Sequence, residues 1–294
     1  MSFITYEVYV VSSSIISLIL EIAPYWVTGL LLGSLVSVYL SVRIAEKVMA
    51  LGAGRLSGFL SICFASVLGV VSPLCMYGTI PVIAAFGRKG VPQHILATFM
   101  ISSVLLNPNL FLLGFVLGTH IALARLGLAL LCGILAGLIV LIFFKKWQIF
   151  KIDRFAPKDK GKKHFFADLL KAFRITVPYF LLGIVITALF NRYIPPHWIS
   201  NIFGARRGVG VLFATSLSIP LYACGGGILP LIRAWLFAGM GYGDALAFMI
   251  AGPATKITNL FAVKMILGTK NFMLYLVYVI GFAVAVGLFI EFIM

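Results

Sequence analysis

Charged residues are scarce in this sequence, and acidic residues are the scarcest. Charged residues make up 11% of the 294 positions, with 8 Asp and Glu against 23 Lys and Arg, while 62% are hydrophobic. A soluble domain carries roughly 25% charged residues. Too little polar surface is available to cover the apolar side chains, so a soluble fold is excluded and the lipid bilayer must solvate part of the protein.

Period-two alternation of apolar and polar residues is also missing, since the apolar runs are long and unbroken. That absence excludes a transmembrane β-barrel, whose strands alternate. Unpaired backbone groups are very unfavourable in hydrocarbon, which leaves helices as the spanning structure. We therefore predict an all-α integral membrane protein, built as a polytopic helix bundle.

The motifs of enzymes and metal centres are absent too. No HExxH, GxSxG or phosphate-loop sequence occurs, and His94 and His120 flank predicted spans without a partner at ligand spacing. The cysteines are scattered rather than paired at loop spacings, and the first positively charged side chain is Arg43. The sequence predicts no enzyme active site, cofactor, metal site or disulfide framework, and no signal peptide with a basic leader.

The basic residues that are present concentrate in the middle of the chain. Residues 145–171 hold nine Lys or Arg and three Asp, and the other basic residues mostly punctuate the apolar runs. This is the positive-inside pattern, so we expect a cytoplasmic loop that attracts anionic lipid headgroups rather than nucleic acid. The loop divides the chain into a first transmembrane repeat (1–144), a basic cytoplasmic linker (145–171) and a second transmembrane repeat (172–294).

Eight apolar runs are long enough to cross a bilayer, given the roughly 20 residues that a span needs. They cover about 15–42, 56–86, 92–118, 121–144, 172–190, 208–240, 245–268 and 272–293. Several runs contain proline and glycine, which break or kink helices, and re-entrant hairpins there would add to the eight spans. The expected breaks are at Pro73, Gly78, Pro81, Asn107-Pro108, Pro220, Gly225, Gly226, Gly227, Pro230 and Pro253, with Pro81 and Pro230 suited to the first turn of a new helix.

The breaks recur in the same order in both halves. Residues 72–82 (SPLCMYGTIPV) resemble 219–231 (IPLYACGGGILPL), and 95–111 (ILATFMISSVLLNPNLF) resemble 245–261 (ALAFMIAGPATKITNLF). These matches predict an internal duplication, with the two repeats either parallel or inverted. Paired interrupted helices are typical of transporters, because exposed backbone groups at membrane depth are tolerated only beside a cavity or inside protein.

Cys75 and Cys224 lie in the paired breaks at nearly equivalent positions. A helix N-terminus favours a thiolate, and two thiols meeting there form a soft site for a thiophilic ligand. Equally, cysteine is a small apolar residue suited to close helix packing. The packing interpretation is the one we give to Cys63 and Cys132.

Other polar residues in the spans are candidates for a solute site. Lys256 lies within a predicted span, where a lysine either faces a cavity or partner or extends its charged end to the interface. Arg233 invites the same argument, and Glu21 is the candidate coupling carboxylate. The polar residues at the breaks either bind a ligand or cap half-helices, and they are Tyr77, Tyr222, Asn107, Asn109, Thr255 and Asn259.

Three motifs, PLCMYG at residues 73–78, PLYACGGG at 220–227 and ALAFMIAGPAT at 245–255, resemble those of the ArsP/YraQ-type predicted permeases. The resemblance covers nearly the whole chain. It implies a multi-pass protein of the bacterial inner membrane that exports trivalent organoarsenicals. Family members often carry Cys-x-Cys-Gly at each break, whereas this chain keeps one cysteine per break. Two thiolates suffice for a monomethylated arsenic(III), which has two exchangeable ligands.

These observations leave three functions open. The first is a permease that exports a small soft solute, such as an organoarsenical, bound by Cys75 and Cys224. The second is a transporter of a small anion or sulfur compound, using Lys256 and the half-helix N-termini near 225–227. The third is a membrane enzyme acting on lipids, which needs clustered acids or histidines that the sequence lacks.

Overall fold

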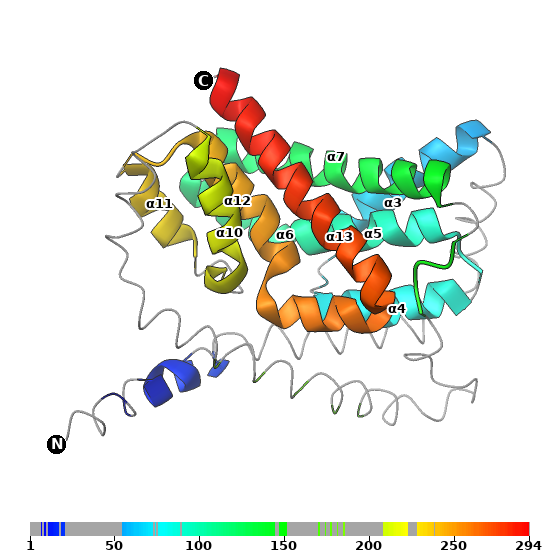
Figure 1. Ribbon diagram of the computed structural model, residues 1–294, viewed down its shortest axis with the longest axis horizontal. Coiled ribbons are helices and arrows are strands. Elements are labelled where there is room, and N and C mark those ends of the chain that lie inside the picture. Colours follow the sequence, from blue (N-terminus) through cyan, green and yellow to red (C-terminus); the bar gives the residue numbers. More distant parts are fainter. Residues whose placement is uncertain are drawn as a thin grey trace.

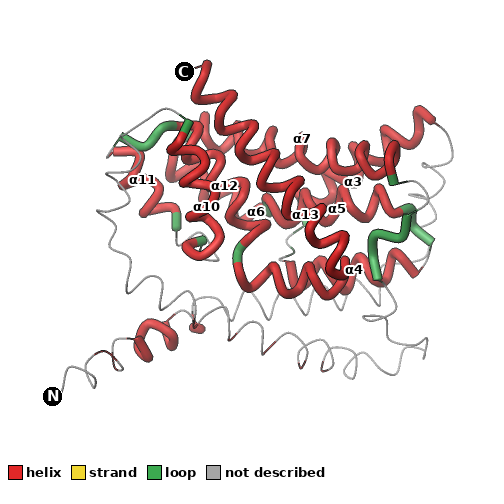
Figure 2. Tube along the Cα trace, viewed as in Figure 1, coloured by secondary structure: helices red, strands yellow, loops and turns green. Residues whose placement is uncertain are grey.

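The computed structural model describes most of the chain from residue 55 onward. It describes residues 55–72, 74, 76–88, 90–144, 147–151, 208–222, 228–237 and 239–293, with scattered positions between 7 and 20 and between 170 and 185. Figure 2 shows helices and loops and no strand among these residues, which confirms the all-α class for them. The predicted spans 15–42 and 172–190 lie almost wholly outside the described residues.

The described helices from residue 55 onward form two series separated by the central segment (Figure 1). In chain order they are α3 (Arg55–Val71), α4 (Met76–Arg88), α5 (Gln93–Leu105), α6 (Pro108–Gly114), the 3-10 helix η1 (Phe115–Leu117), α7 (Thr119–Phe143), α10 (Val209–Leu221), α11 (Leu229–Phe237), α12 (Tyr242–Thr255) and α13 (Ile257–Ile293).

The α7 helix is long and apolar enough to cross a membrane alone. Its 25 residues rise by 1.5 Å each and give a length of about 37 Å, more than the hydrocarbon core of a bilayer. It begins directly after Gly118, whose φ is 113°, and ends shortly before the basic pair at 145–146. The predicted span 121–144 is confirmed to within two residues.

The α13 helix is longer still, and it bends sharply at Gly268. The backbone there has φ 72° and ψ 168°, a conformation that residues with a Cβ atom avoid. Residues 257–267 lie beside α4, and the remainder crosses the molecule diagonally (Figure 1). This bend lies at the predicted boundary between spans 245–268 and 272–293. The predicted span 245–268 is itself divided, because the chain also breaks at Lys256, between α12 and α13.

Corresponding helices of the two halves pack in corresponding pairs. In the first half α3, α5 and α7 pack on one another, and in the second half α10, α12 and α13 do the same. The helices α7 and α13 pass each other in opposite directions (Figure 1). Tyr278 donates its hydroxyl proton to the carbonyl of Cys132, while Asn271, earlier in α13, shares a cavity with Ile139, later in α7.

Small and hydroxyl-bearing residues bring the first-half helices together. The Oγ atoms of Ser66 in α3 and Ser102 in α5 lie 2.9 Å apart, and Ser66 also donates to the carbonyl of Leu130 in α7 at 3.1 Å. A Cβ atom at Gly133 of α7 would overlap Ser102. Such contacts are how helices associate in lipid, where apolar burial gives little driving force between them.

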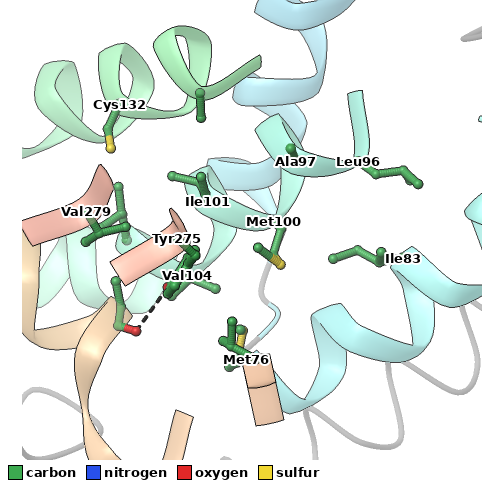
Figure 3. Packing of buried hydrophobic residues seen from close by; sticks show 14 of the residues in the cluster. Met76, Ile83, Leu96, Ala97, Met100, Ile101, Val104, Cys132, Tyr275 and Val279 are labelled. Atoms are coloured by element: carbon green, nitrogen blue, oxygen red, sulfur yellow. Dashed lines mark hydrogen bonds between the residues drawn. The ribbon is translucent and has the colours of Figure 1, made fainter. Parts of the chain in front are cut away.

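The larger apolar core lies where α4, α5, α7, α12 and α13 meet. Figure 3 shows Met76 from the start of α4 close to Val104 of α5 and Tyr275 of α13. The same core includes Ala254, at the end of α12. The core therefore brings the first break of the first half next to the second break of the second half.

Candidate functional site

The first break of each half lies between two helices. In the first half α3 ends at Val71 and α4 begins at Met76; in the second half α10 ends at Leu221 and α11 begins at Leu229. Pro73 and Cys75 lie outside the described residues, as do residues 223–227, which include Cys224, Gly225, Gly226 and Gly227. The structure thus defines the helix ends on either side of each cysteine and leaves the placement of both thiols a prediction.

The prolines differ in what they do to the helices. Pro230 is the second residue of α11, in the first turn as expected, whereas Pro81 is the sixth residue of α4. The helix α4 continues through Gly78 and Pro81, so the prediction that these two residues interrupt it is wrong. A proline removes a single backbone hydrogen bond, and packing by neighbouring helices lets a membrane helix tolerate that loss. Pro220 and Pro253 lie in the last turns of α10 and α12, just before each helix ends.

Asn107 occupies the second break of the first half, between α5 and α6. Its Oδ1 accepts a hydrogen bond from the N–H of Leu110 at 2.9 Å, and its carbonyl accepts one from Phe111 at 2.9 Å. An asparagine before a proline at the first helical position is a favourable N-terminal cap. The sequence left two roles open for Asn107, ligand binding and helix capping, and this contact is a helix cap. The side chains of Tyr77 and Asn109 are not among those described.

The second break of the second half, between α12 and α13, is also held by side chains. Asn259 donates through Nδ2 to the carbonyl of Pro253 at 2.7 Å, and Tyr275 donates to the carbonyl of Ala254 at 3.0 Å, the bond drawn beside Tyr275 in Figure 3. Thr255 donates to the carbonyl of Ala251 at 2.7 Å. The last carbonyls of a helix have no partner within it, so these bonds stabilise the interrupted end at membrane depth.

Lys256 lies at this same break and has only 8% of its surface exposed. Its backbone N–H donates to the carbonyl of Gly252 at 2.9 Å. No hydrogen bond or ion pair joins its ammonium group to another of the described residues. One turn back, Gly252 makes room for Tyr222, because a Cβ atom there would overlap the Tyr222 ring. The end of α10 therefore packs directly on the end of α12, beside Lys256.

Arg125 is the functional candidate that the sequence reasoning missed. It lies in α7, is 2% exposed, and donates from Nη2 to the hydroxyl of Tyr222 at 3.0 Å. Its Nε and Nη1 atoms are buried without a hydrogen-bond partner among the described residues. A charged side chain inside the membrane is unfavourable, by about 2.5–3.5 kcal/mol at the centre of a span and by less toward its ends, and a buried donor without an acceptor adds to that cost. The available signal was a lone arginine within the apolar run 121–144.

Three further charged residues of the second half are Asp244, Glu291 and Arg233. Asp244 is the third residue of α12, in its first turn, and it is 4% exposed. Glu291 lies close by, against Gly241 and Gly243. Arg233 is exposed on α11, with its guanidinium 5.8 Å from the centre of the Phe237 ring. Glu21, the coupling candidate, lies outside the described residues.

An apolar cavity of about 260 Å³ opens between α5, α7 and α13. Its polar lining residues include Asn271, whose Nδ2 donates to the carbonyl of Ile149 at 2.8 Å, and Tyr275 and Tyr278, which also bond to backbone carbonyls. Since these polar groups already have partners, the cavity offers mainly hydrocarbon contact. Among the described residues no group of three or more His, Cys, Asp or Glu side chains is arranged to hold a metal ion.

Comparison with known proteins places this arrangement in a family. UPF0718 protein YcgR of Bacillus subtilis is 24% identical over 95% of this chain and 96% of its own length. UPF0718 protein YraQ of Escherichia coli is 26% identical over 81% of this chain and 68% of its own length. A Streptococcus mutans protein whose name describes a subunit of a two-component membrane permease complex is 26% identical over 87% of this chain and 86% of its own length.

No solved structure matches the chain. The family described as "Predicted permease", ArsP_1, matches residues 9–292, which is nearly the whole sequence and confirms the resemblance to the ArsP/YraQ-type proteins. The apolar helices and the interrupted spans are those of a multi-pass membrane protein, and permeases move solutes rather than convert them. The chain therefore belongs to the ArsP_1 family of predicted permeases.

Proposed function

We propose that this permease carries a small anion across the membrane, through the region where the paired helix breaks meet. The supporting observation is Lys256, a buried lysine at a helix break with no partner for its ammonium group among the described residues. Asp244 lies at the opposite end of the same helix, about 18 Å away along its axis. An intramembrane lysine faces a partner or a transported charge, and here an anionic solute supplies it.

The arrangement of the two halves supports a route between them. Corresponding helices pack in the same pairs, and α7 and α13 run in opposite directions, so we infer that the repeats are inverted rather than parallel. Inverted repeats in transporters place the solute site at their interface, near the middle of the bilayer. Rocking of one half against the other would then open the site to each side in turn. On this proposal the protein lies in the bacterial inner membrane, with its basic central loop in the cytoplasm against anionic lipid.

Transport by purified protein in vesicles tests the anion proposal. We expect proteoliposomes to take up radiolabelled sulfate, thiosulfate or phosphate, and Lys256→Ala to lower the uptake about tenfold or more, as the loss of a charge-assisted contact does. Lys264→Ala is the matched control, because Lys264 is an exposed lysine on α13. Equal uptake by the Lys256→Ala and Lys264→Ala proteins would contradict the role of Lys256.

Export of trivalent organoarsenicals is the second candidate, favoured by the family and by where the cysteines fall. In the sequence, Cys75 directly precedes the first residue of α4, and Cys224 is the third residue after the last residue of α10. Expression in an arsenic-sensitive bacterium should then confer resistance to methylarsenite and not to inorganic arsenite. The double variant Cys75→Ser, Cys224→Ser should abolish that resistance at unchanged membrane levels of protein; undiminished resistance would exclude the thiol mechanism.

A further inference from the structure

We propose that Arg125 and Tyr222 form an oxyanion-binding pair, which recognises the carboxylate or tetrahedral oxyanion group of the solute. The pair joins the long helix of the first half to the first break of the second half. This inference deepens the anion proposal above. It rests on that proposal in one respect, which is that the bound anion is also the transported solute.

The unused donors of the pair carry the argument. Arginine has five N–H groups, and the three on Nε and Nη1 of Arg125 have no acceptor among the described residues although both atoms are buried. The Tyr222 hydroxyl accepts from Nη2 at 3.0 Å, which leaves its own proton to be donated. The pair therefore offers four donors, namely three N–H groups of the guanidinium and the Tyr222 hydroxyl. An arginine with free N–H groups pairs with carboxylate or phosphate-like oxygens in its own plane.

The surroundings hold the pair in place rather than neutralise it. Tyr222 is 5% exposed, with its ring 6.0 Å from that of Phe248 and lodged in the space left at Gly252. Ile121, one turn before Arg125, belongs to the same apolar cluster as Tyr222 and Phe248. A guanidinium fixed by packing needs little further ordering when an anion binds, which favours affinity.

The charge of the site fits an anion and not a cation. Tyr222 accepts a hydrogen bond from Arg125 and packs at Gly252 of α12, and Lys256 follows Gly252 by one helical turn. Asp244 is eight residues before Gly252, about 12 Å along the helix. Along this part of the chain, the positive charge of Lys256 therefore lies at the end of α12 next to Tyr222, and the Asp244 carboxylate lies at the far end.

Fluorescence of Trp235 provides a probe in the unmodified protein. Its ring lies 5.7 Å from Phe248, which in turn contacts Tyr222. We would titrate the purified full-length chain in detergent with sodium sulfate and, separately, sodium acetate, against sodium chloride at matched ionic strength. We expect a saturable change with at least one of the two oxyanions, absent in Trp235→Phe; sulfate alone indicates a tetrahedral group, and acetate alone a carboxylate.

The variants assign the signal to the pair. Arg125→Gln should remove the saturable change, Arg125→Lys should weaken the apparent affinity by about tenfold because the planar fork is lost, and Tyr222→Phe by a few fold. Arg233→Gln is the matched control, since Arg233 is exposed on α11, and it should bind as the unmodified chain does. Arg125→Lys keeps the charge and tests the pair even if Arg125→Gln fails to fold.

Two outcomes would overturn the proposal. No saturable change in the unmodified protein with either oxyanion would mean that a group of the chain itself neutralises Arg125. An unchanged affinity in Arg125→Lys and Tyr222→Phe would place the anion elsewhere. A different pattern would show that only the transport proposal is wrong. In that case the protein would bind an oxyanion in a way that depends on Arg125, and proteoliposomes would take up no anion.

Discussion

The two halves of the molecule share a backbone interruption and differ in the chemistry placed on it. Leu106 and Lys256 occupy matching positions in the similar segments 95–111 and 245–261, and each directly follows a helix of the same rank, α5 or α12. Leu106 is 0% exposed within the apolar core, whereas Lys256 is 8% exposed and cationic. The break itself is therefore a property of the fold, and the charge is a property of one half only.

The long helices α7 and α13 show a related difference. Arg125 and Tyr275 each follow a glycine of positive φ by seven positions, Gly118 in one case and Gly268 in the other. Arg125 reaches Tyr222, and Tyr275 bonds to Ala254, so both long helices direct a polar group to a break of the second half. Both polar contacts therefore lie at breaks of the second half, where the cationic residues Arg125 and Lys256 are also found.

Placing a lysine at the matching position of the first half should have the largest effect on stability. Leu106→Lys would bury a charge in the apolar core at a cost of about 3 kcal/mol. We expect a much lower thermal unfolding temperature in detergent and a lower yield in the membrane fraction. Leu106→Met is the control, because it conserves the volume without the charge. A Leu106→Lys protein as stable as Leu106→Met would show that the two breaks are equally polar.

Closing the space between the ends of α10 and α12 should have the next largest effect. A Cβ atom at Gly252 would overlap the Tyr222 ring, so Gly252→Ala should destabilise by about 2 kcal/mol through overpacking. Gly281→Ala is the control in α13, where a Cβ atom meets nothing within 4 Å, and it should raise helix stability slightly. Thermal unfolding in detergent measures both. Equal unfolding temperatures for the two variants would contradict the close contact of Tyr222 with Gly252.

Much of this architecture is predictable from the sequence because it depends on local chemistry. Composition identifies the bilayer as solvent, and prolines near 73, 220 and 253 mark where helices end. The prediction at Pro81 is wrong because a proline shows only that one N–H is missing, while the packing that tolerates the loss comes from other helices. The equivalence of Leu106 and Lys256 as matching positions rests on the predicted duplication alone.

The contact between Arg125 and Tyr222 was not predictable in the same way. Arg125 lies near the start of an apolar run, where an arginine usually extends to the membrane interface. Its burial depends on Tyr222, 97 positions later in the chain, and on the glycine that admits the Tyr222 ring. Contacts between residues so far apart in the sequence leave no local pattern. Nothing in the sequence around Arg125 or Tyr222 therefore indicates that the two side chains are in contact.

Gly118 and Gly268, the positive-φ glycines at matching positions before Arg125 and Tyr275, allow a comparison in which a smaller difference in stability is expected. Both have positive φ, so alanine at either position costs about 1–2 kcal/mol in backbone strain. A Cβ atom at Gly118 meets nothing within 4 Å, whereas one at Gly268 would lie 2.6 Å from Cε of Lys151. We therefore expect thermal unfolding to place Gly268→Ala at or below Gly118→Ala in stability. A Gly268→Ala protein clearly more stable than Gly118→Ala would contradict the close approach of Lys151 to Gly268.

The two asparagines at the second breaks give the smallest expected effect. Asn107→Ala removes the N-terminal cap of α6, and Asn259→Ala removes the bond to the Pro253 carbonyl, each worth about 1 kcal/mol. If both residues only stabilise helix ends, both variants should unfold at slightly lower temperature and keep full transport. Because Asn259 lies three residues from Lys256, a loss of uptake confined to Asn259→Ala would mean that this asparagine also contacts the solute. A loss in Asn107→Ala as well would extend the solute site to the first half, and the asymmetry argued from Leu106 and Lys256 would not hold.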